Sequence, residues 1–130
     1  MPEIKEKKVY YPSGKLHYVR FTLNNKLHNL NGPAYFSCDV NGNKYSESFY
    51  IDGKLHNLNG PAYISYYENG SKKSESFYVD DRYHNLNGPA VKYYSQVGNL
   101  TSKYYYINDE QINIKTNKAF KQYIKTLCLR

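Results

Sequence analysis

Three histidines at equivalent positions of a repeated sequence are the residues best suited to chemistry in this chain. His28, His56 and His84 each open the sequence His-Asn-Leu-Asn-Gly-Pro-Ala and follow one another at intervals of 28 residues. A shared zinc ion would need imidazole nitrogens about 2.0–2.1 Å from one centre. If each interval is a two-stranded unit, equivalent histidines lie about 10 Å apart. The spacing therefore predicts that each imidazole bonds backbone in its own connector, with no metal site and no cofactor.

The remaining acid–base and nucleophilic residues predict no active site. Glu47 and Glu75 occupy the same repeat position one unit apart, and Cys38 has no counterpart in the other units. An active site needs different groups that converge on one point, whereas duplication spaces identical groups by translation. We therefore expect a protein that is not an enzyme and has no catalytic residues.

Tyrosines offer a candidate binding surface. The chain has 17 tyrosines and no tryptophan, and Tyr50, Tyr78 and Tyr106 recur 28 residues apart. Period-2 alternation directs them away from the Phe/Ile side of the strands, so they would form a ladder on the opposite, wetter face. Such ladders can stack single-stranded bases, which makes nucleic-acid binding the main alternative function.

The distribution of charge favours a protein partner over nucleic acid. The net charge is +7, but residues 9–110 hold ten basic and nine acidic residues. Residues 111–130 hold five basic residues and no acidic one, including Lys118, Lys121 and Lys125. Phosphate binding needs a concentrated basic patch, and only this last segment provides one. These three lysines complete the candidate interaction surface.

The element that must position all these residues is a 28-residue tandem repeat. Leu27–Ala34 recurs without change at Leu55–Ala62, and at Tyr83–Ala90 with Leu replaced by Tyr. Identity at a fixed interval indicates tandem duplication. We predict units that start near residues 27, 55 and 83, preceded by a diverged half-unit, residues 9–26. The structural signature of the repeat is His28, Gly32, Pro33, His56, Gly60, Pro61, His84, Gly88 and Pro89.

Each unit is predicted to be a β-hairpin followed by a connector. In the second full copy, Ala62–Glu68 and Ser71–Val79 are β-rich runs. Asn69-Gly70 between them suits a two-residue type I′ turn, because both central residues of that turn need positive φ. Asp80-Asp81 forms a second turn pair, and Arg82–Gly88 is the connector.

Repeated apolar pairs are the predicted core. They share one repeat position and one face of the return strand: Phe21 with Leu23, Phe49 with Ile51, Phe77 with Val79, and Tyr105 with Ile107. We also expect Leu30, Leu58 and Leu86 to turn inward from the connectors.

The two ends of the repeat differ. Residues 1–8 are a predicted charged tail, whose Lys5, Lys7 and Lys8 lie beside an open first edge. Such an edge can pair with a two-fold copy, which predicts a monomer or a homodimer through the N-terminal hairpin. Residues 111–130 are predicted to hold a capping helix with Thr116 as N-cap. Its apolar stripe at helical spacing is Phe120, Tyr123, Ile124 and Leu127.

The repeat resembles a variant of the MORN repeat. The resemblance rests on Tyr66–Lys72, on Phe77-Tyr78-Val79, and on the connector that starts at Gly53-Lys54-Leu55-His56. The His-x-x-x-Gly-Pro-Ala version is similar to repeats in predicted proteins of large DNA viruses and some bacteria. The resemblance covers about residues 9–110 and implies an elongated hairpin ribbon that acts as a scaffold, and some such proteins bind phospholipid.

These observations combine into one expectation. The fold is mainly β, an elongated antiparallel hairpin repeat with one C-terminal capping helix. The function is a structural scaffold or protein-interaction module with an unknown protein partner, with nucleic-acid binding and membrane-surface association as alternatives. With no apolar leader after Met1 and no long apolar run, a cytoplasmic location is expected, in the host cytoplasm or a virion if the source is viral.

Overall fold

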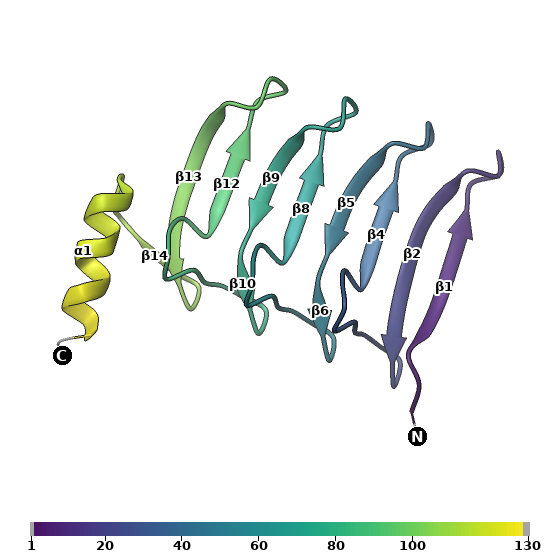
Figure 1. Cartoon of the computed structure of the whole chain (residues 1–130), viewed down its shortest axis with the longest axis horizontal. Coiled ribbons are helices and arrows are strands. Elements are labelled where there is room, and N and C mark those ends of the chain that lie inside the picture. Colours follow the sequence, from purple (N-terminus) through teal and green to yellow (C-terminus); the bar gives the residue numbers. More distant parts are fainter. Residues whose placement is uncertain (1, 129–130) are drawn as a thin grey trace.

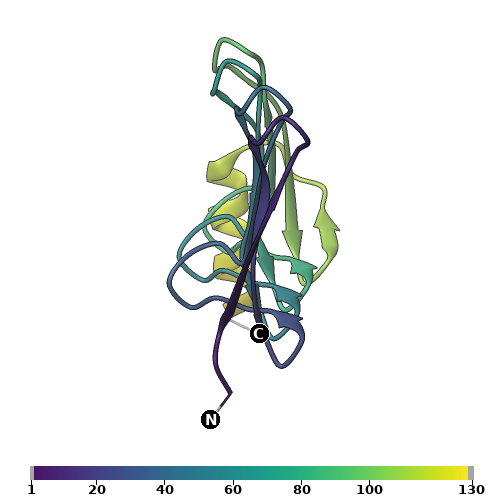
Figure 2. The same ribbon diagram turned by 90° about the vertical axis from the view of Figure 1, so that its right-hand side faces the viewer.

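A computed structural model describes residues 2–128 and shows one open β-sheet followed by a helix (Figure 1). The long strands cross the sheet in chain order, and each pairs antiparallel with its neighbour. Seen edge-on, the sheet is a single layer (Figure 2). The predicted mainly β meander with one C-terminal helix is confirmed. Met1 and residues 129–130, which belong to the predicted tail and helix segment, lie outside the described residues.

Each unit contributes two long strands and one short hairpin. The long strands are β1 (Lys5–Tyr10), β2 (Leu16–Leu23), β4 (Tyr35–Cys38), β5 (Lys44–Ser48), β8 (Tyr63–Tyr66), β9 (Lys72–Ser76), β12 (Val91–Tyr94) and β13 (Leu100–Ile107). The short strands are β3 (Lys26–Leu27), β6 (Tyr50–Ile51), β7 (Lys54–Leu55), β10 (Tyr78–Val79), β11 (Arg82–Tyr83) and β14 (Glu110–Ile112). Equivalent strands start 28 residues apart. Because β1 starts at Lys5, half of the predicted tail belongs to the sheet.

The short hairpins turn through two residues with positive φ. Asp80 and Asp81 have φ of 50° and 67°, and Asp52 and Gly53 have 49° and 79°. These values are those of a type I′ turn, whose twist matches that of the flanking strands. The turn pair predicted at Asp80-Asp81 is confirmed.

The long hairpins turn differently, and the type I′ prediction at Asn69-Gly70 is wrong. Gly70 alone has positive φ, 89°, and its N–H donates to the Tyr67 carbonyl at 2.9 Å. The strand register shifts between Ser65 and Tyr66. This is a type I turn followed by a left-handed glycine that forms a bulge, the usual geometry of a three-residue loop.

The sheet has two faces of different composition. The phenylalanine face carries Phe21, Phe49, Phe77 and Tyr105, and the tyrosine face carries their chain neighbours Tyr50, Tyr78 and Tyr106. Of the first row only Tyr105 is completely buried, whereas Phe49 and Phe77 are half-buried. The predicted core positions therefore line one face, but a single layer leaves them partly open. The buried apolar residues are Val19, Ala34, Ala62, Ala90, Val91, Tyr105 and Phe120.

The connector leucines do not turn inward. Leu30, Leu58 and Leu86 are 75%, 74% and 47% exposed, so the prediction that they join the core is wrong. The asparagine before each leucine explains this. The Asn57 amide donates to the Pro61 carbonyl at 3.0 Å, and its oxygen accepts the N–H of Asn59 at 3.0 Å. These bonds close the connector on itself, and the leucine between the two asparagines is left outside.

The helix α1 (Asn117–Cys128) packs on the phenylalanine face of the last unit. Thr116 caps it, since its hydroxyl accepts the N–H of Ala119 at 3.1 Å, which confirms the predicted N-cap. Within the predicted apolar stripe only Phe120 is fully buried, while Tyr123, Ile124 and Leu127 stay half-exposed.

Candidate functional site

The signature histidines link one unit to the next. The Nδ1 atom of His28 accepts the N–H of Asp52 at 3.0 Å, and His56 and His84 accept those of Asp80 and Asn108 at 3.1 Å. Each acceptor lies in a connector and each donor in the turn of the following short hairpin. The predicted backbone bond is therefore present, but its partner is in the next unit and not in the histidine's own connector. Among residues 2–128, no three His, Cys, Asp or Glu side chains gather at a metal-binding spacing.

The rest of the signature shapes the connector. The carbonyls of Pro33, Pro61 and Pro89 accept the amides of the asparagines four residues earlier at 3.0–3.1 Å. Ala34, Ala62 and Ala90, which follow, are completely buried where each connector enters the next strand. The signature is thus a backbone device that repeats one connector shape.

This repeated shape creates two open grooves on the phenylalanine face. The first, about 570 Å³, has Phe49 and Ile51 between the connectors of His28 and His56. The second, about 540 Å³, has Phe77 and Val79 between the connectors of His56 and His84. Together with the exposed leucines of the three connectors, these are the connector grooves. Sequence reasoning missed them because it placed the leucines in the core.

The chain itself closes the next position in this row. Tyr105 is the repeat equivalent of Phe49 and Phe77, and the Phe120 ring lies 4.7 Å from it, centroid to centroid. The Tyr105 hydroxyl donates to the Asn117 side chain at 2.5 Å. Both rings are completely buried by this contact. An aromatic side chain on an amphipathic helix is therefore a stereochemical fit for this position of the repeat.

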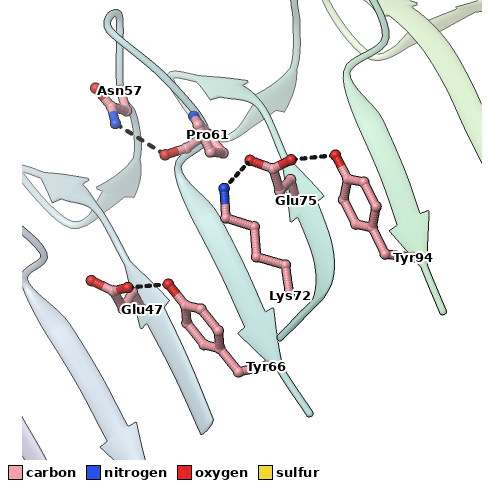
Figure 3. A network of polar contacts seen from close by, with 7 residues as sticks. All are labelled: Glu47, Asn57, Pro61, Tyr66, Lys72, Glu75 and Tyr94. Carbon is pink, nitrogen blue, oxygen red and sulfur yellow. Dashed lines mark hydrogen bonds and ion pairs between the residues drawn. The ribbon is translucent and has the colours of Figure 1, made fainter. Parts of the chain in front are cut away.

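A second cluster on the phenylalanine face joins tyrosine, glutamate and lysine (Figure 3). Glu75 accepts the Tyr94 hydroxyl at 2.6 Å and the Lys72 ammonium at 3.2 Å. One unit earlier, Glu47 accepts the Tyr66 hydroxyl and pairs with Lys44 at 3.3 Å. In each case the tyrosine belongs to the unit after that of the glutamate, so the bond ties adjacent units together.

The protonation states of this cluster fit a tie and not proton transfer at neutral pH. Burial would raise the pKa of Glu75, but the hydrogen bonds of Tyr94 and Lys72 outweigh it and lower that pKa. Burial and the hydrogen bond to Glu75 raise the pKa of Tyr94 to about 12. The carboxylate is therefore ionised and the phenol neutral across a wide pH range.

The predicted tyrosine ladder is present in part. The Tyr78 and Tyr83 rings lie 4.6 Å apart and the Tyr83 and Tyr106 rings 5.0 Å apart. Tyr50 instead pairs with Leu55, which occupies the repeat position of Tyr83. Tyr83 was not among the predicted residues, although it is the one substitution in the third signature octet and could have been found there. Because the three rings cover each other's faces, their edges and hydroxyls are left for a partner.

The predicted lysines do not share a surface with this ladder. Lys118, Lys121 and Lys125 are exposed on α1, which packs on Tyr105, whereas Tyr106 points to the other face. The two halves of the predicted interaction surface therefore lie on opposite sides of the sheet.

Comparison of the chain with protein-family models, curated proteins and solved structures returned no match. The resemblance to MORN repeats stays a prediction. Within residues 2–128 no helix is both long and apolar enough to cross a membrane.

Proposed function

We propose that this protein is a non-enzymatic scaffold that binds a partner protein through the connector grooves, which seat apolar side chains of an amphipathic helix. The observation that supports this most is the contact of Phe120 with Tyr105. It shows the chemistry that satisfies one position of the row, while the equivalent positions at Phe49 and Phe77 are open. Apolar surface that remains in water favours association with a complementary surface.

The repeat spacing specifies the partner further. Adjacent grooves are separated by two strands, about 10 Å. A helix advances about 10.5 Å in seven residues. A partner helix with an aromatic or aliphatic residue every seventh position would therefore place successive side chains in successive grooves.

Charge supports a protein over a polyanion as this partner. The repeat body, residues 9–110, has a net charge of +1, from ten basic and nine acidic residues. Phosphate backbones need a concentrated basic surface. We extend the proposal to a MORN-type scaffold role, for which the hairpin repeat and its single-layer sheet are the supporting features.

Capture from native extract with matched variants tests this function. We expect the double variant Leu58→Asp and Leu86→Asp to lose the captured partner by at least tenfold in yield, because it puts charge on both walls of the second groove. Both leucines are exposed, so folding should be unaffected. Val97→Asp is the control, since Val97 is 83% exposed in a hairpin turn away from the grooves.

Outcomes that would reject the proposal are equally specific. Capture that survives the leucine substitutions would place the contact elsewhere. Capture that disappears on nuclease treatment, or with Lys118→Glu and Lys121→Glu alone, would indicate nucleic acid bound at α1. Cross-linking of a genuine partner should map to a helical segment with apolar residues seven apart.

A further inference from the structure

The joints between units follow one chemical pattern, independent of the connector grooves. In each joint the second long strand of one unit pairs with the first long strand of the next through three residue pairs. The central pair lies on the phenylalanine face: Val19 with Phe36, Glu47 with Ile64, and Glu75 with Lys92. No joint places two like charges in this central pair.

The two ends of the sheet break this pattern. At the C-terminal end, Lys103 occupies the repeat position of Glu47 and Glu75. At the N-terminal end, Lys8 occupies the position of Ile64 and Lys92, and Tyr10 that of Tyr66 and Tyr94. A second copy whose β1 joined β13 in the repeat register would put Lys8 directly opposite Lys103. Its Tyr10 hydroxyl would meet an ammonium in place of the carboxylate found at the inner joints.

Both edges are otherwise open to strand addition. In the part of the chain that the structure describes, β13 has no strand partner on its outer side before Tyr105, where β14 begins to pair. Leu100 and Tyr104 are 47% and 41% exposed, and β1 is exposed except at Val9, which is half-exposed. The helix contacts the sheet at Tyr105 and lies beside the lower half of β13 (Figure 1).

We propose that Lys8 and Lys103 are a charge block that prevents the sheet from joining head-to-tail with a second copy of this chain. Like charges directly opposite on neighbouring strands are destabilising. Lys92, which pairs with Lys103 on its inner side, adds a third ammonium to the same row. Charge, and not backbone shape, closes an edge that would otherwise accept the next hairpin of an identical repeat.

Charge reversal tests this block. Lys103→Glu restores the residue of the inner joints, faces Lys92 favourably within its own hairpin, and would accept the Tyr10 hydroxyl of the next copy. We expect its mass from light scattering to rise with concentration to at least twice the 15.3 kDa of the monomer. Lys8→Glu, which makes the opposite attractive pair, should also associate. The double variant restores like charges and should not associate.

Two further variants separate this contact from others. Lys118→Glu changes the net charge equally but lies on α1, and should leave the mass unchanged. Tyr10→Phe in the Lys103→Glu background should weaken association several-fold. The proposal is overturned if Lys103→Glu stays monomeric while its melting curve shows a folded protein. It is equally overturned if association persists in the double variant, or if the wild type already forms open polymers.

Discussion

At the scale of single residues, the units are joined by a small set of repeated polar bonds. Each joint combines a histidine that accepts a turn N–H with, at the two inner positions, a tyrosine that donates to a glutamate. The glutamate of the central unit is buried, and buried carboxylates need partners because desolvation of an ion is costly. These bonds therefore favour one register between adjacent units.

Removal of the Tyr94 hydroxyl should show the size of this contribution. We expect Tyr94→Phe to lower the free energy of unfolding by about 1–3 kcal/mol at pH 7, because Glu75 loses a charge-assisted hydrogen bond. The lowered pKa of Glu75 means that its contribution is present above the ordinary value of 4.5 and is lost as the pH falls through the folded pKa. The difference between wild type and variant in urea titrations should therefore shrink below about pH 4.

The alkaline limb has the opposite sign. The pKa of Tyr94 is raised from 10.0 to about 12, so its contribution is present below pH 10 and is lost as the pH rises through 12. Tyr104→Phe is the control, since Tyr104 is 41% exposed on the other face. Equal losses in both variants at all pH values would show that the Tyr94–Glu75 bond contributes nothing.

At the scale of elements, α1 serves as a lid on the last hydrophobic position of the row. Its burial is concentrated in one residue, Phe120, and its stripe is otherwise half-exposed. The helix therefore depends on one aromatic contact and on the Thr116 cap, and both can be tested without touching the repeats.

Phe120→Ala should cost about 3–5 kcal/mol in the stability of the docked helix, as for other fully buried phenylalanines. Phe77→Ala should cost less, because the Phe77 ring lies in an open groove and is only half-buried. Hydrogen exchange read by mass spectrometry separates the two: Phe120→Ala should expose amides of residues 117–128 while those of β8 and β9 stay protected. A larger loss from Phe77→Ala would mean that the connector groove is closed in solution.

Much of this element level was predictable from the sequence, because it rests on local signals. The 28-residue period, the positive-φ turn pairs and the helical spacing after Thr116 each depend on nearby residues. The turn at Asn69-Gly70 was not predictable, since Asn-Gly suits both a type I′ turn and a bulged type I turn, and the pairing register decides between them. Leu58 was misplaced because side-chain bonds of Asn57 to the backbone orient the connector.

The candidate site was less predictable than the fold. Tyr66 and Tyr94 reach glutamates of the preceding unit, 19 residues earlier, through a diagonal contact that the period alone does not reveal. The exposed fractions of Phe49 and Phe77 depend on the absence of a covering layer over a described part of the sheet. Such properties belong to the assembled surface and not to any window of sequence.

At the scale of the whole molecule, the sheet behaves as a row of nearly identical units in which each contacts only its neighbours. Stability in such a row is approximately a sum of unit and joint contributions. The length of the protein is then set by the number of units, and its termination by the two altered ends.

Deletion of one complete period tests this additivity. Removal of residues 55–82 joins Lys54 to Tyr83 and keeps every later residue in register. We expect a folded protein whose denaturant m value falls by roughly one fifth, the fraction of the chain removed. Removal of residues 55–68, half a period, breaks the register and should give aggregation or an unfolded chain. A folded half-period deletion would show that the repeat does not determine the fold.

The position of the two termini at opposite ends of a single-layer sheet has a mechanical consequence (Figure 1). Tension between the ends would act across the strands, in the direction of their hydrogen bonds. Each ladder would then open like a zipper, one residue pair after another, and not slide as a block. Such a chain is a compliant tether: it lengthens hairpin by hairpin under a small load and recovers by refolding the same short contacts.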